Sequence, residues 1–244
     1  MEAMRAYAER CVSEILLRLP NRHDLDPLFC ACAIMLVSSL MLGGASRNGF
    51  SGDVTLQFLA IPVLALGFWR LVESDVTPQI RWALWFCVAL VALPLLQLVP
   101  LPPSLWTALP HRELSAESFA LIGKEPPWMP LSVSPQATWL SVLSLLPPLS
   151  IFIGVLLLGY RDRRWLSLVV LAVGVVSAFL GLMQVAQGPT SALRFYQFTN
   201  PTTEAVGFFA NRNHFAALLY VVLLFTVAWA TKAGAEAGLS LSRR

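Results

Sequence analysis

The feature of the sequence that most constrains its fold is a series of six long apolar blocks. They cover residues 27–44, 54–72, 82–99, 137–160, 165–187 and 214–231. Each is close to the roughly 20 residues that a helix needs to cross a bilayer core. Only 13% of the residues are charged, against about 25% in a soluble domain. The sequence therefore predicts an all-α, polytopic transmembrane helical bundle with six spans.

The basic residues of the loops predict the orientation of this bundle, because they accumulate on the cytoplasmic side. With the N-terminus inside, 12 of the 17 lysines and arginines fall on the inner side. The outer five are Arg47, Arg112, Lys124, Arg194 and Arg212. Both termini are therefore predicted to be cytoplasmic. Because basic residues are scattered over both sides, no nucleic-acid partner is expected.

Three parts follow along the chain. Residues 1–26 form a cytoplasmic amphipathic segment, with apolar residues at helical spacing over 4–19. It is expected to lie on the membrane surface, or alternatively to bind a partner. Residues 27–231 form the six-span domain, with outer loops at 100–136 and 188–213. Residues 232–244 form a cytoplasmic tail.

Prolines mark irregular places in the spans and in the first outer loop. Pro62, Pro94 and the Pro147-Pro148 pair predict kinks or breaks, which persist at membrane depth only where protein or a water-filled cavity covers the freed backbone. In the proline-rich loop, "ELSAESFALI" is still able to form a short surface helix. The tryptophans of this region fit an interfacial aromatic belt or a surface that stacks on sugar rings: Trp106, Trp128 and Trp139.

Small and polar residues inside the spans predict how the helices pack. Two pairs of small residues four apart on the fifth block favour close helix contact: Gly174 with Ala178, and Ser177 with Gly181. Gln97 and Gln184 are expected to face the interior of the bundle. Either an interhelical hydrogen bond or contact with a ligand would satisfy their amides.

Several classes of site are disfavoured by what the sequence lacks. It has no phosphate-binding G-x-x-x-x-G-K-[ST] loop, no G-x-S-x-G elbow and no H-E-x-x-H pair. Three histidines and four cysteines without C-x-x-C spacing disfavour a metal site or a disulfide framework, so no metal or cofactor is predicted. The spans carry no buried acidic residue, which disfavours a proton or cation pump.

The candidate site is the polar run Asn211-Arg212-Asn213-His214, where the sixth block begins on the outer side. Asn211 or Asn213 is suited to cap the helix. Arg212 and His214 are unexpected, because cations at a helix N-terminus face the positive end of its dipole. A bound anion reverses that cost, so the run predicts a phosphate or diphosphate site with Arg194 as a second arm. Alternatively, Arg212 snorkels to lipid headgroup phosphates.

The same residues carry a family resemblance. "GFFANRNHFAALL" resembles the N-R-N-H-F-A segment of the bacterial O-antigen ligase and polymerase family, and "PLSVSPQATWLSVLSLL" resembles the stretch that precedes a span in those proteins. The likeness runs over roughly residues 80–231. Members are multi-pass helical proteins of the bacterial inner membrane. They transfer glycan from a polyprenyl-diphosphate carrier at the periplasmic face, in lipopolysaccharide and other surface polysaccharide biosynthesis, without a metal or nucleotide.

The resemblance implies roles for the matching residues. The anion would be the diphosphate of an undecaprenyl-diphosphate-linked glycan. Arg212, with Arg194 in support, would hold it, and His214 would bind a diphosphate oxygen or assist proton transfer. Asn211 and Asn213 would fix the geometry.

Members of the family usually continue for several more spans and a large periplasmic loop rich in further basic residues. We therefore expect this chain to correspond to an amino-terminal portion of such a protein. Two alternatives stay open: a non-catalytic subunit whose partner chain supplies that loop, and a transporter of lipid or glycan.

Overall fold

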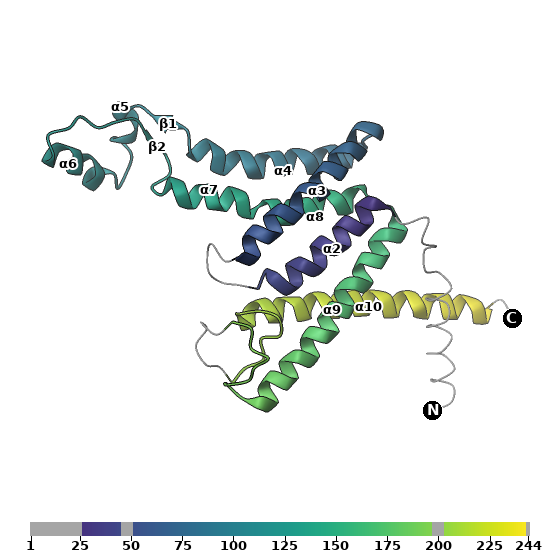
Figure 1. The fold of residues 1–244 in the computed structure, drawn as a ribbon. Coiled ribbons are helices and arrows are strands. Elements are labelled where there is room, and N and C mark those ends of the chain that lie inside the picture. Colours follow the sequence, from purple (N-terminus) through teal and green to yellow (C-terminus); the bar gives the residue numbers. More distant parts are fainter. Residues whose placement is uncertain (1–25, 45–50, 197–202, 243–244) are drawn as a thin grey trace.

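The protein is almost entirely helical (Figure 1). This computed structural model describes residues 26–44, 51–196 and 203–242. The helices are α2 (Pro27–Leu42), α3 (Ser51–Glu73), α4 (Pro78–Gln97), α5 (Pro103–Trp106), α6 (Glu113–Leu121), α7 (Pro135–Ser144), α8 (Leu146–Leu157), α9 (Tyr160–Gln187) and α10 (Arg212–Ser242). The described residues also contain two short strands, β1 (Pro100–Leu101) and β2 (Met129–Pro130), which pair antiparallel.

Five helical segments of the described chain are long and apolar enough to cross a membrane. They are α3, α4, the pair α7–α8, α9 and the part of α10 that ends at Gly234. The predicted all-α membrane bundle is confirmed at this level. The first apolar block forms α2, an apolar helix of only 16 residues, so six spans and the orientation of the termini stay predictions.

Helix α2 lies at the centre of the first half of the molecule. It packs against α3, α8 and α9, and its side chains Leu28, Cys32 and Met35 are fully buried. Gly154 of α8 makes this packing possible, because a Cβ there would lie 2.3 Å from Cys32 Sγ. Helix α2 is thus held in place by close packing against its neighbours.

The predicted break at Pro147-Pro148 is confirmed. Helix α7 ends and α8 begins around Leu145, and both prolines lie in the first turn of α8, where their missing N–H groups are tolerated. Helices α3 and α4, by contrast, continue through Pro62 and Pro94.

Helices α9 and α10 pack closely, as the small residues of the fifth block predict. Gly174 faces Val222, and a Cβ on that glycine would lie 2.2 Å from Val222 Cγ2. Further along the pair, Trp229 Nε1 donates a hydrogen bond of 3.1 Å to Ser167 Oγ. The Arg164 guanidinium carbon lies 4.1 Å from the centre of the Trp229 ring. Packing at one place and polar contacts at another therefore fix the two helices.

Residues 100–134 form a small lobe beyond the ends of α4 and α7 (Figure 1). The expected surface helix is α6, whose residues are all at least partly exposed. Arg112 is buried, and its guanidinium donates to the carbonyls of Pro130 and Leu131. This arginine therefore holds the lobe together from inside.

The prediction that Trp106 belongs to an exposed belt or sugar platform is wrong. Its side chain is completely buried, and its indole N–H donates a hydrogen bond of 2.8 Å to Pro127 O. Phe119 of α6 packs edge-on against it. Trp106 is thus the core of the lobe, whereas Trp128 and Trp139 are exposed and their role stays a prediction.

The lobe and the residues that join α9 to α10 lie at the same end of the molecule, on the left in Figure 1. We call it the loop end. The α3–α4 and α8–α9 turns lie at the opposite end, which we call the turn end (Figure 1). The amphipathic helix predicted within 1–26 lies outside the described residues. At the other terminus, the predicted tail continues as helix α10 up to Ser242.

Candidate functional site

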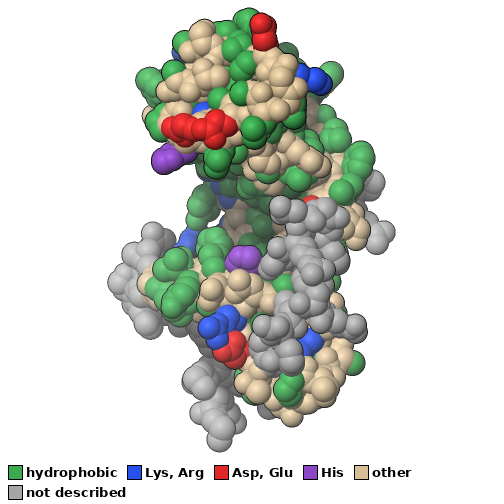
Figure 2. Space-filling model, turned by 90° about the vertical axis from the view of Figure 1, so that its left-hand side faces the viewer, with side chains coloured by type: hydrophobic (Ala, Val, Ile, Leu, Met, Phe, Trp, Pro, Cys, Tyr) green, Lys and Arg blue, Asp and Glu red, His purple; other side chains and the backbone are tan. Residues whose placement is uncertain are grey.

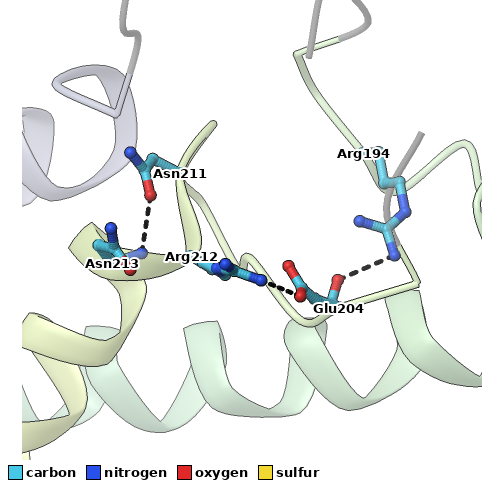
Figure 3. Close-up of polar contacts among 5 residues, drawn as sticks. All are labelled: Arg194, Glu204, Asn211, Arg212 and Asn213. Atoms are coloured by element: carbon cyan, nitrogen blue, oxygen red, sulfur yellow. Dashed lines mark hydrogen bonds and ion pairs between the residues drawn. The ribbon is translucent and has the colours of Figure 1, made fainter. Parts of the chain in front are cut away.

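The predicted site lies at the loop end, where α10 begins. Asn211 is the residue that caps this helix, because its Oδ1 accepts the backbone N–H of Asn213 at 2.8 Å (Figure 3). The Asn211 carbonyl also accepts the N–H groups of His214 and Phe215, at 3.1 and 3.3 Å. The N-cap residue is therefore Asn211. The role of Asn213 is to supply the backbone N–H group that the Asn211 side chain accepts.

Arg212, the first residue of α10, forms an ion pair with Glu204 (Figure 3). Both side chains are in contact with solvent, with 63% of Arg212 and 43% of Glu204 exposed. The positive charge at the start of the helix is thus balanced by a carboxylate of the same chain. The sequence predicts that Arg212 binds an anion, and in the structure its guanidinium already pairs with the Glu204 carboxylate.

Sequence reasoning missed Glu204. A signal for it exists, because it is the single acidic residue in the loop 188–213, which also holds Arg194 and Arg212. A lone acid in a loop with two arginines is a candidate ion-pair partner. Which arginine it pairs with depends on the path of the loop.

Arg194 reaches the same residue from the other side. Its guanidinium donates to the backbone carbonyl of Glu204 at 3.0 Å (Figure 3). It also donates to the carbonyls of Gly188 and Gln184 at 3.3 and 3.4 Å. Arg194 therefore ties the loop to the C-terminal end of α9, and both arginines converge on Glu204 through different atoms.

Gln184 fixes the returning loop to α9. Its side chain is fully buried, and its amide nitrogen donates to the carbonyls of Leu193 and Gly207 at 3.0 and 2.8 Å. Its amide oxygen accepts the N–H groups of Val206 and Gly207 at 3.0 and 2.9 Å. The prediction that Gln184 faces the interior is confirmed, but its partners are loop backbone groups rather than another helix.

Two glycines allow the loop to pass close to its neighbours. Gly207 has a φ of +58°, and a Cβ there would lie 2.3 Å from Ser177 Oγ. The hydroxyl of Ser177 accepts the N–H of Phe208 at 3.3 Å. Gly44, beyond the end of α2, accepts the N–H of Ala210 at 2.9 Å. The loop is thus fastened to both α9 and α2 just before Arg212.

His214 is exposed at the loop end. Its ring packs edge-on against Phe209, with 6.4 Å between ring centres. Among the described residues no hydrogen bond to this ring is found. His214 lies two residues after Arg212 on α10, and side chains at this spacing on a helix do not face each other.

One titratable group of the loop is perturbed. Burial raises the pKa of the Tyr196 phenol above its usual value, and the charge of Asp53 raises it further. A tyrosine phenol is neutral at physiological pH even at its usual pKa of about 10, and the raised pKa of Tyr196 leaves it neutral.

Figure 2 looks onto the loop end. Charged side chains gather there in two places, one over the upper part that holds the lobe and one over the lower part, with hydrophobic side chains between them. Within the described ranges, no three His, Cys, Asp or Glu side chains come together to hold a metal ion.

A surface hollow of the described residues lies elsewhere. It has a volume of about 340 Å³ and is lined by Pro78, Arg81, Trp82 and Trp85 at the start of α4, at the turn end. The predicted anion site is not part of this hollow.

No family model, no curated protein and no solved structure matches the chain.

Proposed function

We propose that this protein handles an undecaprenyl-diphosphate-linked glycan at the periplasmic face of a bacterial inner membrane, as a ligase-like or polymerase-like glycosyltransferase or a portion of one. The observation that carries the proposal is the exposed Arg212 guanidinium on the first turn of α10, which already binds a carboxylate. A group that holds a carboxylate in this way also suits a phosphate oxygen.

The surroundings support the same chemistry. Asn211 orders the first turn of α10, where the helix dipole favours negative charge. His214 is exposed two residues further along α10 and is the titratable group nearest in sequence to Arg212. In the transfer reaction, Arg212 would hold the diphosphate as it departs from the sugar, and His214 would bind one of its oxygens or move a proton.

The proposal is tested by direct binding. We expect farnesyl diphosphate, a short prenyl diphosphate, to bind the purified protein in detergent by isothermal titration calorimetry. Arg212→Ala should weaken this binding at least tenfold, because a hydrogen bond to a charged group contributes about 1.5–3 kcal/mol.

The matched control is Arg81→Ala, which removes an exposed arginine at the turn end. This variant should bind like the wild type. Equal affinity of Arg212→Ala and the wild type would refute the diphosphate assignment.

A further inference from the structure

We infer that Glu204 is a built-in competitor for the anion site of Arg212: its carboxylate occupies the guanidinium until a diphosphate displaces it. The inference rests on the proposed function, because it concerns the same arginine. It assigns a regulatory role to a residue that belongs to neither the N-R-N-H segment nor the helix that bears it.

Glu204 is held at two separate points. Its carboxylate pairs with Arg212, and its backbone carbonyl accepts a hydrogen bond of 3.0 Å from Arg194 (Figure 3). The carboxylate is thus able to leave Arg212 by rotation of the side chain, while Arg194 still holds the main chain. Displacement requires no movement of a helix.

The main chain beside Glu204 is unable to withdraw easily. Val206 and Gly207 follow it by two and three residues, and both donate their N–H groups to the buried Gln184. A displaced carboxylate therefore stays within reach of Arg212. Its effective concentration at the guanidinium remains high, as for any tethered ligand.

The ion pair is also weak enough to be displaced. Both partners are substantially exposed, at 63% and 43%, and a solvent-exposed ion pair contributes little to stability. A diphosphate carries more negative charge than one carboxylate and offers more acceptor oxygens. Competition by Glu204 weakens the apparent affinity of Arg212 for every anion by the same factor. A phosphodiester headgroup, which binds weakly, then does not bind Arg212, whereas a diphosphate, which binds tightly, still does.

The test compares the wild type with Glu204→Gln and Glu204→Ala, using farnesyl diphosphate and inorganic pyrophosphate as two probes. We expect both variants to bind both probes about twofold to fivefold more tightly, the factor equivalent to a solvent-exposed ion pair. Glu125→Gln is the control, since it removes another exposed acid of the loop end without touching Arg212.

The outcomes separate this inference from the proposed function. Tightening of both probes in both Glu204 variants, but not in Glu125→Gln, supports the competitor. Unchanged or weaker binding in the Glu204 variants, together with a loss in Arg212→Ala, overturns the competitor and leaves the diphosphate site standing. Tightening of farnesyl diphosphate alone would assign the effect to the prenyl chain and also overturn it. Wild-type binding by Arg212→Ala refutes the proposed function itself.

Discussion

At the scale of single residues, a few buried polar side chains hold the loop segments of the loop end in place. Gln184 satisfies four hydrogen bonds with one amide, and all four go to the loop backbone. Arg112 performs a similar task in the lobe through two carbonyls. A buried backbone group that loses its partner costs about 1–3 kcal/mol, so these two side chains stabilise segments that have little regular structure of their own.

Gln184→Leu should therefore destabilise the protein and loosen the loop that carries Glu204. The variant leaves the N–H groups of Val206 and Gly207 without their acceptor, and we expect a loss of at least about 1–3 kcal/mol. Thermal unfolding in detergent measures it as a lower Tm.

The control for this change is Gln187→Leu, three residues further along the same helix. Gln187 is exposed, and within the described chain its amide oxygen accepts a hydrogen bond from the Ser191 hydroxyl. It should unfold close to the wild-type Tm. A Gln184→Leu protein with an unchanged Tm would contradict the anchoring role of this amide.

At the scale of elements, close contact between helices depends on small residues, because apolar burial alone gives helices in lipid no reason to associate. Gly174 allows α9 to approach Val222 of α10, and Gly154 allows α8 to approach Cys32 of α2. The packing of α10 against α9 in turn sets where Arg212 stands relative to the loop.

Gly174→Ala should lower the stability of the α9–α10 pair. The added Cβ would lie 2.2 Å from Val222 Cγ2, and such overpacking costs about 1–3 kcal/mol. This exceeds the gain of up to about 1 kcal/mol from replacing a helical glycine by alanine. The measurement is again the Tm in detergent.

Gly234→Ala provides the matched control, since a Cβ at this helical glycine of α10 meets nothing within 4 Å. It should keep or slightly raise the Tm. The double variant Gly174→Ala/Val222→Ala should recover part of the loss. If Gly174→Ala were as stable as Gly234→Ala, the contact would not limit helix approach.

At the scale of the whole molecule, the helices alternate in direction so that the lobe and the α9–α10 loop share the loop end (Figure 1). The basic residues of the sequence predict that this end faces outward. A single orientation in the membrane therefore brings the lobe and Arg212 to the same side.

Labelling of single cysteines in intact cells tests this arrangement. After replacement of the four native cysteines, Glu125→Cys in the lobe and Asp75→Cys in the α3–α4 turn are each exposed. A membrane-impermeant maleimide should modify the cysteine at 125 and spare the one at 75 until the cells are lysed. The opposite pattern would place Arg212 on the cytoplasmic side, away from the face that the proposed function requires.

Four features could be predicted from the amino-acid sequence: the helical membrane class, the division near Pro147-Pro148, the inward position of Gln184 and the cap at the start of α10. These depend on local properties: the length of an apolar run, a missing N–H group, a polar side chain in an apolar helix, and an asparagine before the first turn. Each is set within one continuous stretch of the chain, so a linear pattern is enough to predict it.

The burial of Trp106 and Arg112 and the pairing of Glu204 with Arg212 could not be predicted from the sequence and follow from the three-dimensional fold. Trp106 and Arg112 lie in a segment without regular periodicity, where burial depends on how the chain folds back on itself. Arg212 pairs with Glu204 of the loop between α9 and α10. The position of this loop depends on its hydrogen bonds to Gln184, which precedes Gly207 by 23 residues. Contacts of this kind arise from the path of the chain in three dimensions, and neither hydropathy nor helical spacing records that path.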